Sequence, residues 1–211
     1  MKCRICGVRR PRRYCPGVNG DICSICCGTQ REVTVRCPYS CVYLQEARTH
    51  EREPLDPKTL PNRDIVVRER FIAEHAEQMT AVTEVLAAAV LRVEGAADAD
   101  ARDALEALIR TYRTLSSGLY YDTRPENAIA ARMFDAFQDG MKERRRVMQQ
   151  EGAAFPIDSE VLVMLAFLQR VAIDRDNGRP LCRAFLQEIE ESLNSPSRAP
   201  AQQGPSLIHL A

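Results

Sequence analysis

Eight of the nine cysteines fall within the first 41 residues of this 211-residue chain. They are Cys3, Cys6, Cys15, Cys23, Cys26, Cys27, Cys37 and Cys41. Two Cys-x-x-Cys pairs begin at Cys3 and Cys23, the spacing typical of zinc knuckles, and a slightly longer pair ends at Cys41. Eight thiolates are the number needed for two tetrahedral sites of four sulfurs each. The spacing therefore predicts that the cofactor is zinc and that the chain binds two zinc ions.

This stretch is rich in Arg, Gly and Pro between its cysteines and has no apolar run long enough to build a core. Metal ligation must then supply the stability, so we expect the segment to fold only with metal. In a reducing cytosol, clustered thiols are more often metal ligands or redox groups than disulfides. A disulfide framework and iron–sulfur ligation are the alternatives to zinc.

Neighbouring Cys26 and Cys27 leave the division of ligands open. Adjacent side chains point in different directions, so each of the two can serve a different ion. One ion takes Cys3, Cys6 and Cys23 with either Cys26 or Cys27. The other takes Cys15, Cys37 and Cys41 with whichever cysteine remains. Both assignments interleave along the chain and predict a cross-braced fold.

The order Cys3-x-x-Cys6, Tyr14-Cys15-Pro16 and Cys23-Ser24-Ile25-Cys26-Cys27 resembles the first two thirds of a HIT-type or MYND-type zinc finger. Both families bind two zinc ions in an interleaved manner, and their Cys-Ser-x-x-Cys signature implies that Cys27 joins Cys3, Cys6 and Cys23. The chain then departs from the pattern, since Cys37 and Cys41 replace the closing His and Cys. HIT-type fingers act in the assembly of multiprotein complexes, and MYND-type fingers dock proline-containing peptides. The resemblance therefore implies a protein-interaction module.

Beyond the cysteines, the sequence predicts an all-α helical bundle. Apolar residues recur three and four apart in five stretches, Ile72–Val93, Leu105–Leu119, Ile129–Met148, Val161–Ile173 and Leu181–Leu193. The resulting organisation is a double zinc-binding module over 1–52, a proline-rich linker over 53–61, a bundle of about five helices over 62–193, and a disordered tail over 194–211. The fold class is thus a small cross-braced zinc-binding module plus an all-α helical bundle.

Local signals predict several finer features. The run that follows Cys41 is rich in helix-forming residues and is expected to begin a helix. Arg31–Arg36 alternates and is rich in β-branched residues, so it is expected to form one strand of a small hairpin. Thr123–Glu126 is a capping box for the third bundle helix, and Pro180 is expected to begin the last one. The ninth cysteine, Cys182, lies beside an apolar helix face and is expected to be a small buried hydrophobic residue.

The charge of the chain is unevenly placed. Residues 1 to 48 hold nine Lys or Arg and three Asp or Glu, a net +6, which the remainder balances. The densest basic loop contains Arg9, Arg10, Arg12 and Arg13, next to Tyr14, and can grip phosphate and stack on a base. The competing interpretation is that these arginines only offset the negative charge of zinc-bound thiolates.

Signatures of catalysis are missing, among them a Gly-rich phosphate loop, Gly-x-Ser-x-Gly and His-Glu-x-x-His, so we expect the protein not to be an enzyme. No signal peptide or bilayer-length apolar segment is found, which predicts a cytoplasmic protein without a membrane partner. The predicted function is a non-enzymatic zinc-binding adaptor or regulatory protein with a protein partner. Nucleic-acid binding and a zinc-thiolate redox switch are the alternatives. The sequence specifies neither the partner nor the oligomeric state.

Overall fold

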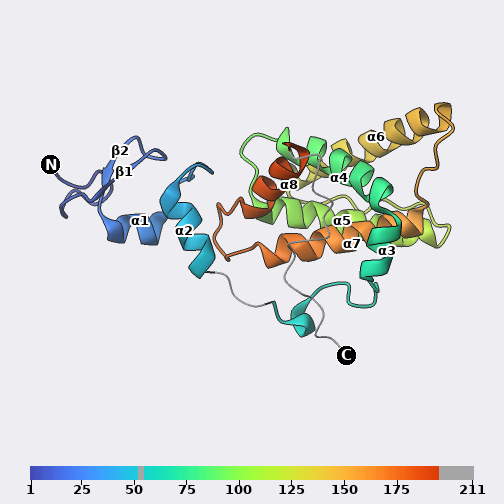
Figure 1. Cartoon of the computed structure of the whole chain (residues 1–211), viewed down its shortest axis with the longest axis horizontal. Helices are drawn as coiled ribbons and strands as arrows, with labels where there is room; N and C mark the ends of the chain where they lie inside the picture. Colours follow the sequence, from blue (N-terminus) through green and yellow to red (C-terminus); the bar gives the residue numbers. More distant parts are fainter. Residues whose placement is uncertain (52–54, 195–211) are drawn as a thin grey trace.

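The computed structural model describes residues 1–51 and 55–194, and this part of the chain is mostly helical. The cysteine-rich segment, here called the N-terminal module (residues 1–51), lies at one end of an elongated molecule (Figure 1). The helices of residues 69–194, here called the bundle, form the other end. Residues 195–211, almost all of the predicted disordered tail, lie outside the described residues, as do residues 52–54 around the start of the predicted linker.

A small hairpin and two helices make up the N-terminal module. Strands β1 (Arg13–Cys15) and β2 (Gly20–Ile22) pair antiparallel. They are followed by α1 (Ser24–Gln30) and α2 (Val42–His50), and the latter begins directly after Cys41, as the sequence predicts. The buried cluster of the module consists mainly of cysteines and also contains Ile22, Val35 and Leu44. So small an apolar cluster agrees with a segment that needs metal to fold.

The predicted strand over Arg31–Arg36 is wrong. The backbone N–H groups of residues 33–35 all donate to the carbonyl of Gln30 at the end of α1, at 3.0–3.1 Å. Glu32 has a φ of 52°, in the left-handed region. The segment is therefore a tight turn that retains only an isolated bridge between Arg31 and Val35. The end of α1 and the contacts of Glu32 determine where its β-branched residues lie. A local alternation pattern contains no information about either.

The five predicted bundle helices appear in order, and the first of them is broken into two. The helices are α3 (Glu69–Glu74), α4 (Ala76–Leu91), α5 (Asp98–Ser116), α6 (Ala128–Gln150), α7 (Asp158–Asp174) and α8 (Ala184–Asn194). The break falls at His75, whose ring stacks on Phe71 at 4.2 Å and lies 3.4 Å from Glu160. In the described ranges, none of the helices combines the length and the apolar character needed to cross a bilayer.

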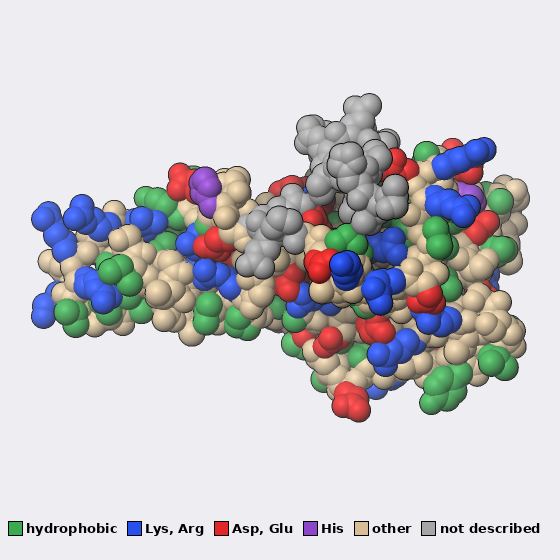
Figure 2. Space-filling view, turned by 90° about the horizontal axis from the view of Figure 1, so that it is seen from below, with side chains coloured by type: hydrophobic (Ala, Val, Ile, Leu, Met, Phe, Trp, Pro, Cys, Tyr) green, Lys and Arg blue, Asp and Glu red, His purple; other side chains and the backbone are tan. Residues whose placement is uncertain are grey.

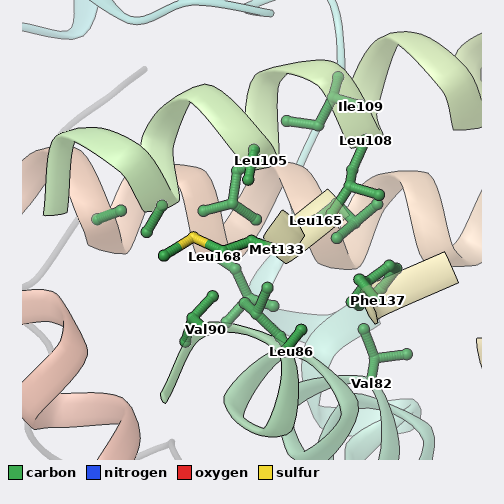
Figure 3. Packing of buried hydrophobic residues seen from close by; sticks show 14 of the residues in the cluster. Val82, Leu86, Val90, Leu105, Leu108, Ile109, Met133, Phe137, Leu165 and Leu168 are labelled. Carbon is green, nitrogen blue, oxygen red and sulfur yellow. The ribbon is translucent and has the colours of Figure 1, made fainter. Parts of the chain in front are cut away.

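One hydrophobic core joins the bundle helices (Figure 3). Helix α5 packs against α6 and α7, while α4 packs against α6 and α8. Leu105 and Leu108 of α5, Phe137 of α6 and Leu165 of α7 are fully buried where these helices meet. Helices α4 and α6 approach closely because Gly140 has no side chain, and a Cβ there would lie 2.8 Å from Val85.

Two predicted helix starts are wrong. Helix α6 is capped by Asn127, whose side-chain oxygen accepts the N–H groups of Ile129 and Ala130, rather than by Thr123–Glu126. Helix α8 begins at Ala184 rather than at Pro180. Its first N–H groups donate to the buried carboxylate of Asp98, a residue remote in sequence. Burial raises the pKa of this carboxyl, and the two backbone donors act in the opposite direction.

The bundle core gives a direct test of the fold. Leu108→Ala should lower the free energy of unfolding by about 2–5 kcal/mol, because it leaves a cavity among fully buried side chains. Leu119→Ala is the matched control, since it makes the same chemical change at a side chain that is 63% exposed. Urea unfolding followed by circular dichroism measures both. Equal losses for the two variants would contradict this placement of the core.

Candidate metal centre

Four cysteine sulfurs meet between the first knuckle and the start of α1. The sulfurs of Cys3, Cys6, Cys23 and Cys26, here called the first cysteine set, all lie within 4.8 Å of one another. Cys3 and Cys6 flank a tight turn in which Gly7, with a φ of 66°, donates to the Cys3 carbonyl at 2.8 Å. Cys23 is the N-cap of α1, so Cys26 follows in the first helical turn. Two ordinary backbone turns thus face each other and bring their thiols together.

This set fits a metal ion in donor chemistry and in size. Zinc–sulfur bonds of about 2.3 Å place the sulfurs of a tetrahedral site about 3.8 Å apart. The sulfurs here lie within 4.8 Å, so a closure of about 1 Å completes such a site. Four soft sulfur ligands without a carboxylate or imidazole select zinc or an iron–sulfur cluster over magnesium or calcium. The four residues can therefore bind one metal ion.

Backbone N–H groups already stabilise negative charge within the first cysteine set. Cys23 N–H donates to the Cys3 sulfur at 3.2 Å, and Cys26 N–H donates to the Cys23 sulfur at 3.4 Å. Burial acts to raise the pKa of Cys3, but the backbone donors of Cys6, Cys23 and Ile5 lower it to about 6. Burial and the neighbouring thiols raise the pKa of Cys26 to about 12. The cluster therefore favours one thiolate and resists accumulating four without a cation.

Cys15, Cys27, Cys37 and Cys41, here called the second cysteine set, lie farther apart. In the described ranges, only the first set meets the 4.8 Å separation. Burial, together with the charges of Cys41 and Cys15, raises the pKa of Cys37 to about 11. The sulfur of Cys27 accepts a hydrogen bond from Arg13 at 3.8 Å. The second set shares one buried cluster with the first but is not gathered as tightly.

The structure distinguishes between the two divisions of ligands that the sequence left open. Cys26, and not Cys27, lies with Cys3, Cys6 and Cys23. The placement of Cys27 that the HIT-type and MYND-type resemblance implied is therefore not the one found. Cys26 is the third residue after the N-cap Cys23, and its N–H points at that residue's sulfur. The helical turn thus fixes Cys26 beside Cys23 and directs Cys27 toward Arg13. Cys182 stays apart from both sets, 1% exposed, as predicted.

The predicted basic loop divides into two groups. Arg9 and Arg13 face thiols, since a hydrogen bond to the Cys23 thiolate raises the pKa of Arg9 and Arg13 donates to Cys27. Arg13 also lies over the ring of Tyr43, 3.9 Å from its centroid. Arg10 and Arg12 are exposed, and Tyr14 is 55% exposed. Neutralisation of thiolates therefore accounts for two of the four arginines and leaves the others unexplained.

A buried carboxylate joins the N-terminal module to the bundle. Glu32, whose side chain is 2% exposed, accepts hydrogen bonds from Arg48 at 2.9 Å and from Asn177 at 2.8 Å. Its backbone carbonyl also accepts the N–H of Leu181 at 2.8 Å. Asn177 and Leu181 belong to the segment between α7 and α8, here called the docking segment (residues 175–183). Glu32 thus fixes the module against the bundle through both its side chain and its backbone.

Arg179 of the docking segment extends this junction to both helices of the module. One guanidinium nitrogen donates to the carbonyls of Gly28 and Arg31, at 3.0 and 2.6 Å, at the end of α1. The other lies 3.3 Å from Glu51 at the end of α2. A cation at a helix C-terminus satisfies carbonyls that have no partner within the helix. Neither Glu32 nor Arg179 was predicted as a functional residue. The partners that connect each of them across the junction lie 128 to 151 residues away, so no local pattern connects them.

The junction yields a second test. Glu32→Gln keeps the shape of the side chain but replaces one carboxylate oxygen by an amide that meets the donor of Arg48 or of Asn177. It should lower the free energy of unfolding by about 1–3 kcal/mol. It should also speed hydrogen–deuterium exchange in residues 175–183. Glu46→Gln, at an exposed position on α2, is the matched control. Unchanged exchange in the docking segment would show that Glu32 does not hold it.

We found no match for this chain among protein-family models, curated protein sequences or solved structures. The resemblance to HIT-type and MYND-type fingers therefore stays a prediction. It rests on the cysteine order of the first 27 residues.

Proposed function

We propose that this protein is a non-enzymatic zinc-binding adaptor, in which two structural zinc ions fold an N-terminal module for protein–protein interaction. The observation that carries the proposal is the approach of four thiols to within 4.8 Å from two Cys-x-x-Cys turns. Four sulfur ligands saturate a tetrahedral zinc ion and leave no position for water or substrate. A zinc ion in such a site supplies stability and no catalytic chemistry.

The second cysteine set supports a second ion. Cys15 and Cys37 are buried, and Cys41, the N-cap of α2, packs against the same cluster. Cys27 also packs against this cluster, and its sulfur accepts a long hydrogen bond from Arg13. Cys27 would be the fourth ligand of the second ion, beside Cys15, Cys37 and Cys41. Because Cys26 and Cys27 are consecutive residues of α1, binding of both ions would connect this helix to each site.

The adaptor role rests on how the module is mounted. Salt bridges and hydrogen bonds of Glu32, Arg48 and Arg179 hold the module on the bundle at its inner end. The hairpin and the first knuckle are left at the outer end of the elongated molecule (Figure 1). A rigid module projected in this way suits the binding of a macromolecule better than the enclosure of a small substrate.

Metal content tests the proposal directly. Elemental mass spectrometry of the full chain, purified under reducing conditions, should give two zinc ions per chain. Cys6→Ser and Cys41→Ser should each remove one ion, because each removes a ligand from a different set. Cys182→Ser is the matched control and should keep both ions. Iron, or no metal, would contradict a zinc module. A single ion in the unchanged chain, or two ions that both survive Cys41→Ser, would contradict the second site.

Cobalt substitution separates a structural site from a catalytic one. Cobalt-loaded protein should show the absorption of tetrahedral sulfur coordination, and added azide or thiocyanate should leave the spectrum unchanged, since four cysteines occupy every position. A spectrum that shifts with azide would reveal an open coordination position and would favour an enzyme.

A further inference from the structure

The outer end of the N-terminal module is strongly basic. Residues 1–22 hold six Lys or Arg and a single acidic residue, Asp21. Figure 2 shows Lys and Arg side chains gathered at this end of the molecule. Arg9 and Arg13 face the cysteine sulfurs and belong to the metal centre. The remaining cations, Lys2, Arg4, Arg10 and Arg12, are all exposed.

Within residues 1–51 and 55–194, three of these cations have no anionic partner. Lys2, Arg10 and Arg12 make no ion pair or side-chain hydrogen bond with any residue in the described ranges 1–51 and 55–194. The bundle differs, because most of its charged side chains are paired, for example Arg124 with Asp135 and Arg175 with Glu188. Thiolate neutralisation does not explain exposed cations that make no hydrogen bond to a cysteine sulfur in the described part of the chain. Their charge is available to an external anion.

An aromatic ring is fixed beside these cations. Strand β1 alternates, so Arg13 and Cys15 face the interior of the module while Tyr14 faces outward next to Arg12. The Tyr14 hydroxyl donates to the Asn19 side chain at 2.6 Å, and Arg4 donates to the Asn19 carbonyl at 3.0 Å. The ring and the guanidinium are therefore held by the same turn residue.

Arg4 reaches this position because Gly20 has no side chain. A Cβ at Gly20 would lie 2.3 Å from Cδ of Arg4, so the side chain of Arg4 crosses the hairpin directly over the glycine backbone. Directly paired residues point to the same face of a sheet, and Gly20 pairs with Cys15, so Arg4 lies on the face opposite to Tyr14. Its guanidinium still reaches the turn residue that accepts the hydrogen bond of the ring. Arg4, Arg12 and Tyr14, which flank the hairpin, are here called the basic platform. It combines cations with an exposed ring that is already positioned.

We propose that the basic platform binds single-stranded nucleic acid, with phosphates at Arg4, Arg12 and the neighbouring Arg10, and a base stacked on Tyr14. Stacking of bases on aromatic rings beside a cationic track is the general mode of single-strand binding. An acidic peptide would use the cations but would gain little from the ring. Without a helix that presents side chains to a groove, the platform reads no base sequence. The inference rests on the proposed metal-folded module, because the hairpin lies between the ligands Cys6 and Cys23.

Fluorescence anisotropy with a labelled 12-nucleotide oligo-dT and the zinc-loaded full chain tests this proposal. The logarithm of the affinity should fall with the logarithm of salt concentration with a slope of about −2, as expected for three phosphate contacts. The double variant Arg10→Ser/Arg12→Ser should weaken binding at least tenfold and reduce the slope by about 1.4, the share of two contacts. Arg63→Ser/Arg68→Ser makes the same charge change at exposed residues outside the module and should change the affinity less than twofold.

The ring is tested separately from the charge. Tyr14→Ser should weaken binding about fivefold or more, because it removes a stacking surface. Tyr14→Phe keeps the ring and loses only the hydrogen bond to Asn19, so it should restore most of the affinity. Zinc content and circular dichroism of every variant are measured in parallel. A variant that keeps its zinc and its helicity reports on the platform alone.

Three outcomes would overturn the proposal. The first is an affinity for oligo-dT that does not change with salt concentration. The second is an equal loss of affinity in Arg10→Ser/Arg12→Ser and in the control Arg63→Ser/Arg68→Ser, and the third is an affinity that Tyr14→Ser leaves unchanged. If polyglutamate competes fully and the ring has no effect, the platform binds an acidic protein segment instead. If oligo-dT does not bind while two zinc ions are present, this inference fails and the zinc module stands. If no zinc is found, the module itself has failed.

Discussion

Four thiols held within 4.8 Å of one another are the constraint on which the N-terminal module depends. As thiolates they repel each other, and the few backbone donors around Cys3 and Cys23 stabilise about one negative charge. A divalent cation bound there would remove this repulsion and close the two Cys-x-x-Cys turns on each other. The position of the β1–β2 hairpin depends on this site, since the hairpin begins and ends between residues of the cysteine sets. In the proposed metal-folded module, the basic platform therefore depends on the metal without contacting it.

Features that depend on local residues could be predicted from the sequence. Cysteine spacing identified both knuckles, and the start of α2 after Cys41 followed from its helix-forming residues. The bundle helices followed from apolar residues three and four apart, because each helix buries one continuous face. The first apolar pattern, Ile72–Val93, continued through His75, where the helix breaks. Periodicity indicates which side of a helix is buried and not whether its backbone is continuous.

Features set by distant residues or by particular backbone hydrogen bonds could not be predicted. Helix α8 begins at Ala184 because Asp98 accepts its first N–H groups, and the backbone ahead of it is drawn to Glu32. The segment Arg31–Arg36 turns instead of forming a strand because Gln30 accepts three successive N–H groups. The division of ligands between Cys26 and Cys27 depends on α1 beginning directly after Cys23. In each case the deciding partner is a backbone group or a carboxylate that no sequence spacing reveals.

The junction at Glu32 joins parts of the chain that the ribosome makes at very different times. The first 41 residues carry all the cysteines of both sets and emerge early, so metal can be bound before any helix of the bundle exists. Asn177, Arg179 and Leu181, which hold the module in place, are among the last described residues to be made. Until then the module is connected to the growing bundle only through the chain. Its orientation is therefore the last feature of the described fold to be established during synthesis.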